Sequence, residues 1–287
     1  MAARLERLVL LARRQAFKLR VSALKRHEVH QRRLAAFLAG REPLTLSPFP
    51  SPPTYAVVVP CYNHAAYLPQ ALRSIEAQML TPTEVVLVDD CSTDATWDII
   101  TELAAASPLG PRITILRNEQ NLGQCAALNA AVVQTSADII VVLNDDDYLM
   151  HDALEWIDKV FHQHPEAGLV GAKAVGVRSQ VYLDNLKKTV AGPLISDELV
   201  TVVSSPKAAR RFQHARQLVM SHSGSAFRRE AWEAADGYYA DKNRRIVIYS
   251  DRDFQLRVNC LYPVVIVENA AFAFWRSGSS VDGGLFT

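Results

Sequence analysis

The sequence has few of the features that mark several common protein classes. Its four cysteines are widely spaced and form no C-x-x-C pair, which argues against a structural zinc site. They are Cys61, Cys91, Cys125 and Cys260. No apolar run reaches the roughly 18–20 residues that a membrane helix needs, and Arg13 and Arg14 interrupt the stretch where a signal peptide would have its apolar core. We therefore expect a cytoplasmic protein with free thiols in a reducing environment.

Charge is nearly balanced over the 287 residues but is unevenly distributed. Residues 1–41 contain 11 Lys and Arg against two Glu, a net +9, and the remainder contains 20 basic against 28 acidic residues, a net −8. A basic segment on an acidic body indicates that the segment contacts an anionic surface or docks on protein. Nucleic-acid binding is not expected, because the body of the chain is acidic.

An N-terminal helical extension is predicted over residues 1–40. Residues 3–39 lack Pro and Gly and are rich in Leu, Ala, Arg and Lys, a composition that favours helix, and Gly40 ends it. An apolar stripe with spacings of three and four includes Leu5, Leu8, Val9, Ala12, Ala16 and Leu19. The stripe either packs on the body or on another subunit of a homo-oligomer, or places the helix at an anionic bilayer as a peripheral membrane contact. Packing is favoured, because large aromatic residues are scarce in the helix.

The composition then changes from helix to strand. Residues 41–54 contain five prolines and are predicted to form a semi-rigid linker. Four continuous apolar runs follow, as expected for strands buried on both faces of a sheet, at 55–60, 84–89, 112–117 and 138–143. Helices are predicted at 65–78, 94–106, 123–134 and 152–163, with Asp94 and Asp152 as candidate N-caps. This alternation predicts an α/β fold with a doubly wound, mostly parallel sheet flanked by helices.

Carboxylates gather where two of these strands end. Asp89 and Asp90 follow one strand, and the acidic triplet Asp145, Asp146 and Asp147 follows another. Ligands of open α/β sheets bind at the carboxyl ends of the strands, and Asp89 and Asp90 either hydrogen-bond a nucleotide there or cap the next helix. Adjacent carboxylates repel one another unless a cation neutralises them, and oxygen ligands suit Mg²⁺ or Mn²⁺. The alternative is a solvated acidic loop.

Six segments, in this order and spacing, point to a known family. They are VVVPCYNHAAYLPQALRSI, VVLVDDCSTDAT, RNEQNLGQCAALNAAV, VVLNDDDYLMHDAL, SHSGSAFRREAWEAADGYY and SDRDFQLRV. Each is weak alone but the set is specific, and it resembles glycosyltransferase family 2, whose members have the nucleotide-sugar-binding GT-A fold. The resemblance covers about residues 55–280 and implies a nucleotide-binding half, 55–150, and an acceptor half, 151–280.

The resemblance also implies roles for individual residues. Asp251 would be the general base that takes a proton from the acceptor hydroxyl. The acidic triplet would replace the family's metal-binding Asp-x-Asp, with Asp146 as the favoured ligand of a divalent cation and Asp145 or Asp147 assisting. The implied nucleotide contacts are Pro60, Tyr62, Asn63, Asp89, Asp90, Asn121, Gly123, Gln124 and Asp145.

Three positions depart from the family pattern. Asn144 stands where an Asp is usual, and Ser250 stands where a Glu commonly precedes the base. Residues 274–284 lack the histidine that many relatives use near the metal or diphosphate, and Arg276 is expected to bind phosphate instead. Gly224 and Tyr238 are the further candidates for diphosphate or acceptor contact.

The resemblance implies an inverting glycosyltransferase that moves a sugar from a nucleotide-diphosphate sugar, with UDP as the expected nucleotide, to a hydroxyl of a glycan or lipid-linked acceptor. Bacterial surface-polysaccharide assembly is the usual setting of such relatives. One alternative is a nucleotidyltransferase that makes nucleotide sugars, although PCYNHAAYL lacks the Gly and Lys of that class. The other is a catalytically silent nucleotide-sugar-binding scaffold, which the two missing family residues would permit.

Overall fold

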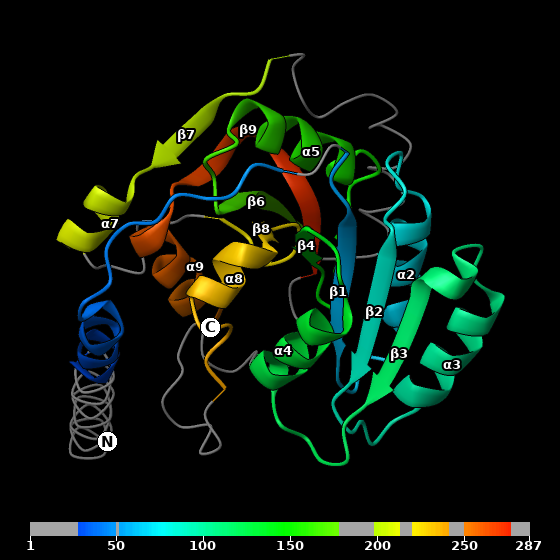
Figure 1. Ribbon diagram of the computed structural model, residues 1–287. Coiled ribbons are helices and arrows are strands. Elements are labelled where there is room, and N and C mark those ends of the chain that lie inside the picture. Colours follow the sequence, from blue (N-terminus) through cyan, green and yellow to red (C-terminus); the bar gives the residue numbers. More distant parts are fainter. Residues whose placement is uncertain (1–27, 50–51, 178–197, 213–219, 241–249, 277–287) are drawn as a thin grey trace, which may run out of the picture.

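A mixed sheet of nine strands forms the centre of the described structure (Figure 1). This computed structural model describes residues 28–49, 52–177, 198–212, 220–240 and 250–276. The strand order is β3-β2-β1-β4-β8-β6-β9-β5, and β7 pairs with β9 beside this path. The two halves that the resemblance implies therefore share one sheet.

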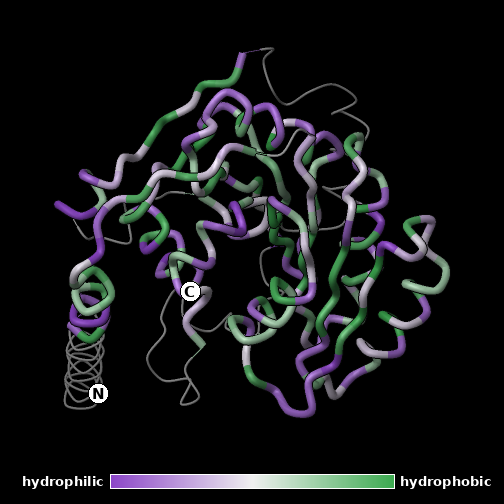
Figure 2. Tube along the Cα trace, in the orientation of Figure 1, coloured by the Kyte–Doolittle hydropathy of each residue, from purple (hydrophilic) through white to green (hydrophobic). Residues whose placement is uncertain are grey.

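The four apolar runs form the parallel half of the sheet, as predicted. The strands are β1 (Tyr55–Cys61), β2 (Glu84–Asp89), β3 (Ile113–Arg117) and β4 (Ile139–Val142). β1 pairs in parallel with β2 and with β4, and β2 pairs in parallel with β3. Every residue of β1 and β4 is buried, which explains why these strands are apolar throughout and do not alternate (Figure 2).

Four helices lie close to the predicted positions: α2 (Leu68–Glu76), α3 (Thr96–Ala106), α4 (Gln124–Gln134) and α5 (Ala153–Gln163). The largest difference is at α2, which begins three residues later than expected. Turns occupy residues 65–67, and Pro69 stands in the first helical turn, where no backbone N–H is needed. The predicted alternation of strand and helix is therefore confirmed over residues 55–163.

The two predicted N-caps behave differently from the expectation. Asp94 lies one position before the cap residue of α3, but its Oδ1 accepts a hydrogen bond from the Thr96 N–H at 2.9 Å. Asp152 holds the cap position of α5, yet its carboxylate accepts from the indole N–H of Trp156 at 3.0 Å and caps no backbone group. Asp152 is thus the N-cap residue as predicted, but its side chain bonds to the neighbouring indole.

The remaining elements have no clear periodicity in the sequence. The strands among them extend the sheet in an order that differs from their order in the chain. The remaining elements are η1 (Gly110–Arg112), β5 (Tyr148–Leu149), β6 (Leu169–Val177), β7 (Thr201–Ser204), α7 (Pro206–Phe212), β8 (Ala226–Arg228), α8 (Arg229–Ala234), α9 (Ser250–Leu261) and β9 (Val264–Arg276). β8 is antiparallel to both β4 and β6, whereas β6 is parallel to β9. The short β8 thus joins the parallel half to the second half.

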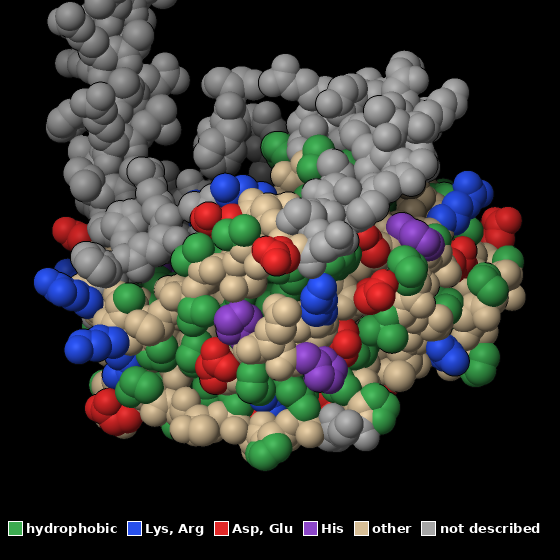
Figure 3. Space-filling model, turned by 90° about the horizontal axis from the view of Figure 1, so that it is seen from above, with side chains coloured by type: hydrophobic (Ala, Val, Ile, Leu, Met, Phe, Trp, Pro, Cys, Tyr) green, Lys and Arg blue, Asp and Glu red, His purple; other side chains and the backbone are tan. Residues whose placement is uncertain are grey.

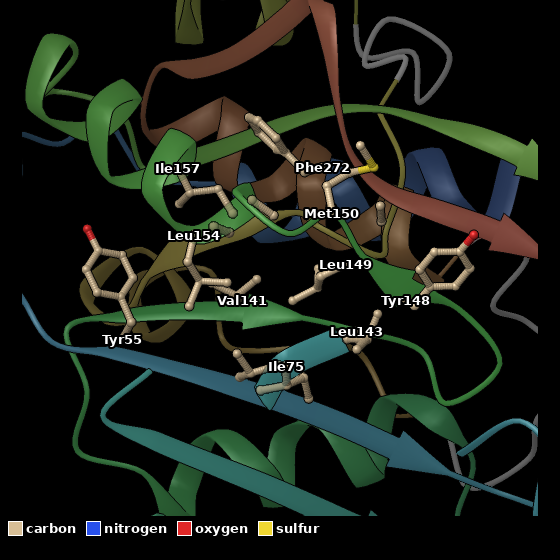
Figure 4. Close-up of a cluster of buried hydrophobic side chains, with 14 of the residues drawn as sticks. Tyr55, Ile75, Val141, Leu143, Tyr148, Leu149, Met150, Leu154, Ile157 and Phe272 are labelled. Atoms are coloured by element: carbon tan, nitrogen blue, oxygen red, sulfur yellow. The ribbon is translucent and has the colours of Figure 1, made fainter. Parts of the chain in front are cut away.

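Alternate residues of β1 enter two separate hydrophobic cores. Val57 belongs to a cluster with side chains of α2, α3 and α5, whereas Val58 belongs to a cluster with side chains of α4, α8 and α9. The sheet is therefore covered by helices on both faces, which is the layered arrangement that a parallel sheet requires. Figure 4 shows the first cluster, whose labelled members include Ile75, Val141, Leu149, Leu154 and Phe272.

The described part of the Pro-rich linker runs along the body. The Leu44 N–H donates to the Leu261 carbonyl at 2.9 Å. Further along, the Arg228 guanidinium donates to the Ser47 carbonyl and lies over the Phe49 ring, with its central carbon 3.8 Å from the ring centroid. Residues 41–49 are thus seated on the body by both backbone and side-chain contacts.

The helical extension is described only from residue 28, and residues 28–38 are helical. Leu34 is buried in a small cluster with Ala209, Leu256 and Cys260, so this part of the extension packs on α7 and α9. This agrees with the favoured alternative for these residues, whereas the apolar stripe from Leu5 to Leu19 lies outside the described residues. None of the helices in the described segments is long and apolar enough to cross a bilayer.

The face that looks upward from Figure 1 carries side chains of both charges. Figure 3 shows Lys and Arg interspersed with Asp, Glu and hydrophobic groups over the described part of this face. The part of this face that is described therefore shows no large basic patch.

Neighbouring valines of α4 allow a matched test of the core. Val132 is fully buried, whereas Val133 is 68% exposed on the same helix. We expect Val132→Ala to lower the free energy of unfolding by about 2–3 kcal/mol, because two buried carbons and their contacts are lost. Val133→Ala should change it by less than about 0.5 kcal/mol. Urea unfolding of both variants measures the difference, and equal effects would contradict the assigned orientation of α4.

Candidate active site

The loops that follow β1, β2 and β4 meet at one edge of the sheet, below the arrowheads of β2 and β3 in Figure 1. The register places Cys61 opposite Asp89, and the Asp90 N–H donates to the Cys61 carbonyl at 2.9 Å. The Tyr62 N–H donates to Asp145 Oδ2 at 2.9 Å. Predicted site residues from three separate loops are therefore in contact.

Pro60 and Asn63 shape the loop after β1. Pro60 lies near the end of β1, in register with Val88 of β2 but beyond the last pair of β1 with β4, Val58 and Val142. A proline is tolerated where the ladder on one side of the strand has ended. Asn63 has a positive φ of 55°. Its side-chain Oδ1 accepts from the Thr93 N–H at 2.8 Å, which ties this loop to the loop after β2.

Asp90 organises the loop that opens α4. Its Oδ1 accepts from the Leu122 N–H at 2.8 Å and from the Asn118 side chain at 2.8 Å, and its Oδ2 accepts from the Gly123 N–H at 2.6 Å. Gly123 has a φ of +89°, a conformation that glycine adopts without strain. Asn121 lies within this loop, so the predicted nucleotide contacts at 121 and 123 depend on Asp90 for their placement.

Asp89 is fully buried at the end of β2. Its Oδ1 accepts from the Ser92 N–H at 3.1 Å, and Arg117 Nε lies 3.1 Å from its Oδ2. Asp89 therefore holds the turn after β2 and pairs with a cation of β3. The contact of Asp89 or Asp90 with a nucleotide base stays a prediction.

The acidic triplet is buried, with 4% of Asp145, 7% of Asp146 and 2% of Asp147 exposed. Asp145 accepts from the Tyr62 N–H and lies 2.8 Å from His64 Nδ1. Asp147 accepts from the Ser223 hydroxyl at 2.5 Å and from the Arg276 N–H at 3.0 Å. The alternative of a solvated acidic loop is wrong, because all three carboxylates are withdrawn from water.

Asn144 and Gln124 connect the triplet to α4. The Gln124 Nε2 donates to the Asn144 Oδ1 at 2.8 Å, and the Asn144 side chain also donates to Asp147 at 3.4 Å. An Asp at position 144 would add a fourth carboxylate here, so the Asn that departs from the family pattern supplies a donor in place of a charge.

His64, Asp145 and Asp146 form the group best placed for a cation. Their ligand atoms, one from each side chain, all lie within 4.8 Å of one another. One imidazole nitrogen and two carboxylate oxygens fit a divalent ion such as Mn²⁺. Asp146 was expected to bind with Asp145 or Asp147 assisting. Asp145 belongs to this group, whereas both Asp147 oxygens accept hydrogen bonds from Ser223 and Arg276.

Burial sets the protonation of the triplet. Burial raises the pKa of Asp145 above its ordinary value, and the hydrogen bond and positive charge of His64 oppose this rise. Burial, followed by repulsion from Asp146, raises the pKa of Asp147 to about 7, and the Ser223 hydrogen bond opposes it. Positive charge at this site would therefore relieve an unfavourable arrangement of carboxylates.

Arg276 brings positive charge to the same place. Its Nε donates to the Asp146 carbonyl at 3.2 Å, and its terminal nitrogen donates to Gln70 Oε1 at 2.5 Å. The guanidinium also lies over the Tyr67 ring, 4.7 Å from the ring centroid. Arg276 is thus fixed beside the triplet by α2 and its preceding turn, and its contact with a diphosphate stays a prediction.

Asp251 stands half-buried in the first turn of α9. Its negative charge raises the pKa of His222, although burial has the larger effect and lowers that pKa. Ser223, the residue after His222, donates to Asp147. The Nε of Arg257, a cation on the same helix, bonds to Asp253 Oδ2 at 2.9 Å, and the role of Asp251 as general base stays a prediction.

The structure gives Gly224 and Tyr238 internal roles. Gly224 has a φ of +80°, and a Cβ added there would lie 2.8 Å from the Phe272 Cβ, so no larger residue fits. Tyr238 is 2% exposed and stacks on Phe254 with ring centroids 4.2 Å apart. The Tyr238 hydroxyl lies 3.1 Å from His222 Nε2, and the expected contact of Gly224 and Tyr238 with a ligand stays a prediction.

His64 and Ser223 are site residues that the sequence did not single out. His64 follows Tyr62 and Asn63 directly, which was the available signal, but a lone histidine beside a polar loop is more often structural. Ser223 is 79 residues from Asn144, whose N–H donates to its hydroxyl at 3.1 Å. Only the antiparallel pairing of β8 with β4 brings this serine to the triplet.

A mixed α/β sheet with acidic loops at the carboxyl ends of its parallel strands defines a nucleotide-binding class of fold. The family model described as glycosyl transferase family 2 matches residues 56–234. The chain belongs to glycosyl transferase family 2, which confirms the resemblance seen in its motifs.

The curated relatives align with this chain over only part of their length. An uncharacterized glycosyltransferase of Nostoc sp. is 29% identical over 178 residues, which cover 62% of this chain and 52% of the relative. The poly(ribitol-phosphate) beta-N-acetylglucosaminyltransferase TarS of Staphylococcus aureus is 27% identical over 165 residues, which cover 54% of this chain and 27% of TarS. The chain therefore spans about half, or less, of the length of these relatives.

Solved structures show the same fold. A crystal structure of TarS residues 1–349 with UDP-GlcNAc aligns with a TM-score of 0.56 and 18% identity, covering 79% of this chain and 59% of that one. A mannosyltransferase of Pyrobaculum calidifontis with GDP-Man and Mn²⁺ aligns with a TM-score of 0.50 and 20% identity, covering 86% and 67%. These likenesses confirm the predicted α/β sheet with flanking helices.

The ligand group predicts a specific pattern of metal binding. We expect Mn²⁺ to raise the melting temperature of the wild-type protein and to have little effect on Asp146→Asn or His64→Ala, because each loses one of three ligands. Asp98→Asn, at an exposed carboxylate in the first turn of α3, serves as the control. Thermal unfolding with and without Mn²⁺ measures this, and an undiminished Mn²⁺ effect in both ligand variants would refute the assignment.

Proposed function

We propose that the protein is an inverting glycosyltransferase. It moves a sugar from a nucleoside-diphosphate sugar, with UDP as the first nucleotide to test, to a hydroxyl of a glycan or lipid-linked acceptor. Asp251 acts as the general base, and His64, Asp145 and Asp146 hold a divalent cation. Membership of the family supports the reaction class.

The proposal depends on one observation: three side chains able to bind a metal ion and the guanidinium of Arg276 lie together at one end of the sheet. His64, Asp145 and Asp146 converge within 4.8 Å, and Arg276 is anchored to the Asp146 carbonyl. A buried cluster of this kind suits a diphosphate that gains negative charge as it leaves. A solvated acidic loop, the alternative for the triplet, would require neither the histidine nor the arginine.

Each group has a distinct part in the transfer. The cation, when bound, stabilises charge on the departing diphosphate. Arg276 contributes a fixed positive charge beside the same oxygens. On the other side of the sugar, Asp251 accepts the proton of the acceptor hydroxyl while that oxygen bonds to the anomeric carbon and the bond to the diphosphate oxygen breaks.

The named relatives guide the choice of substrates to test. TarS is named as a transferase of N-acetylglucosamine to poly(ribitol-phosphate) and has been solved with UDP-GlcNAc. The Pyrobaculum protein has been solved with GDP-Man. These names support UDP-linked sugars as first donors, GDP-linked sugars as second, and hydroxyl-rich surface polymers as acceptors.

A donor and acceptor screen tests the proposal. We expect release of the nucleoside diphosphate to depend on acceptor and on Mn²⁺, and to fall by about 10²–10⁴-fold in Asp251→Asn, since general bases contribute on that order. Asp251→Asn should retain the thermal shift that donor nucleotide gives the wild type. The control Asp98→Asn replaces an exposed carboxylate of α3, distant in the sequence from Asp251, and should keep full activity.

The alternatives give different results in the same screen. Pyrophosphate release from a nucleoside triphosphate and a sugar phosphate would identify a nucleotidyltransferase. Donor binding without turnover for any acceptor would identify a silent binding protein. Full activity in Asp251→Asn would remove this residue as the base while leaving the transferase class intact.

A further inference from the structure

The docked helix, residues 28–38, lies against the element that carries the proposed base. Leu34 is 2% exposed and packs with Leu256 and Cys260 of α9 and with Ala209 of α7. Figure 1 shows this helix, in blue, beside α7 and α9 and away from the parallel strands. The N-terminal extension therefore contacts elements of the predicted acceptor half, which lie more than 150 residues later in the chain.

A buried ion-pair chain links the docked helix to the first turn of α9. His30 Nε2 lies 3.0 Å from Asp253 Oδ1, and Asp253 Oδ2 accepts from Arg257 Nε at 2.9 Å. Asp253 is 3% exposed. Burial alone would raise the pKa of Asp253, but the His30 hydrogen bond and the Arg257 charge outweigh it and lower that pKa. The carboxylate is thus held ionised, because it has partners on both sides.

The docked helix and the residues after it also contact the end of α8 and the turn that follows it. The Arg33 guanidinium lies over the Tyr239 ring, 3.1 Å from its centroid. Arg41 donates to the Ala234 carbonyl at 2.7 Å and to Asp236 Oδ2 at 2.7 Å. Contacts from residues 30–41 therefore fix both the end of α8 with its following turn and the first turn of α9.

Asp251 and Asp253 share that first turn, two residues apart, but face different neighbours. Asp253 bonds to His30 and Arg257, whereas the charge of Asp251 acts on His222, the neighbour of the Ser223 that donates to Asp147. Both carboxylates lie in one helical turn, so a contact that holds Asp253 also restrains the backbone that carries Asp251.

We propose that His30 is a positioning residue for the transfer reaction, which acts through Asp253 to hold Asp251 in place. This inference rests on the proposed role of Asp251 as the general base. The N-terminal extension thereby becomes part of the machinery that aligns the acceptor hydroxyl with the base, in addition to any contact it makes with other surfaces. Misplacement of a base by about 1 Å is enough to slow a reaction by up to about 100-fold.

Kinetics of the full-length protein test the inference. His30→Ala should lower kcat by about 10–100-fold and change the KM for the donor by less than about twofold, because donor-binding groups lie on other loops. His30→Gln keeps a side-chain N–H donor toward Asp253 and should recover most of the lost kcat. Asp253→Asn combined with His30→Ala should lose no more than the larger single loss, since both act through one contact.

A matched histidine provides the control. His162 lies 3.3 Å from Asp158 on the exposed surface of α5, so His162→Ala also removes a His–Asp contact but should leave kcat unchanged. If His30→Ala keeps full kcat, or if His30→Gln is as impaired as His30→Ala, the positioning role is refuted. A parallel rise in donor KM would also refute it, because that result indicates a general loss of structure.

Amide hydrogen exchange separates failure of this inference from failure of the proposed function. His30→Ala should speed exchange in the peptide covering α9 by about fivefold or more, with His30→Gln close to wild type and His162→Ala unchanged. Unchanged exchange in His30→Ala overturns the inference whatever the activity. Faster exchange together with full activity in Asp251→Asn would instead show that the contact is real but that the base was wrongly assigned, which refutes the catalytic role given to His30.

Discussion

The burial of carboxylates at the end of the parallel strands is the constraint on which the site depends. An unpaired charge withdrawn from water costs several kcal/mol, so each buried oxygen needs a donor or a cation. The Tyr62 N–H and His64 serve Asp145, and Ser223 and the Arg276 N–H serve Asp147. These partners come from the loop after β1, the segment before β8 and the end of β9. Satisfying the charges therefore forces distant segments to meet, and the meeting point is the site.

The same requirement explains why apparent ligand residues are occupied within the protein. Asp90 accepts three hydrogen bonds that shape the loop before α4, and Asn63 holds the turn after β2. A loop built in this way holds its backbone groups and Gly123 in a fixed arrangement. Specificity for a ligand then comes from the geometry of the loop as much as from any single side chain.

The extension and linker pack on the outer side of α7, α8 and α9. Arg228 holds the linker at Ser47, and the docked helix contacts α7 and α9 through Leu34. A helix that packs on its own protein buries apolar area and the stems of its basic side chains, and this holds for the described residues 28–38. The basic residues that are described here pair mostly with backbone carbonyls, carboxylates and aromatic rings of the body.

Sequence alone determined the parallel half of the fold and the family. Short continuous apolar runs such as VVLVD are typical of strands that are buried on both faces. Acidic residues directly after such strands lie at the carboxyl edge of the sheet. Tertiary structure decided which carboxylates face each other. His64 joins Asp145 across 81 positions, and Ser223 withdraws Asp147 from the ligand group. It also buried Tyr238 and placed His30 against Asp253. These pairings depend on three-dimensional packing between elements distant in the chain, which local spacing does not encode.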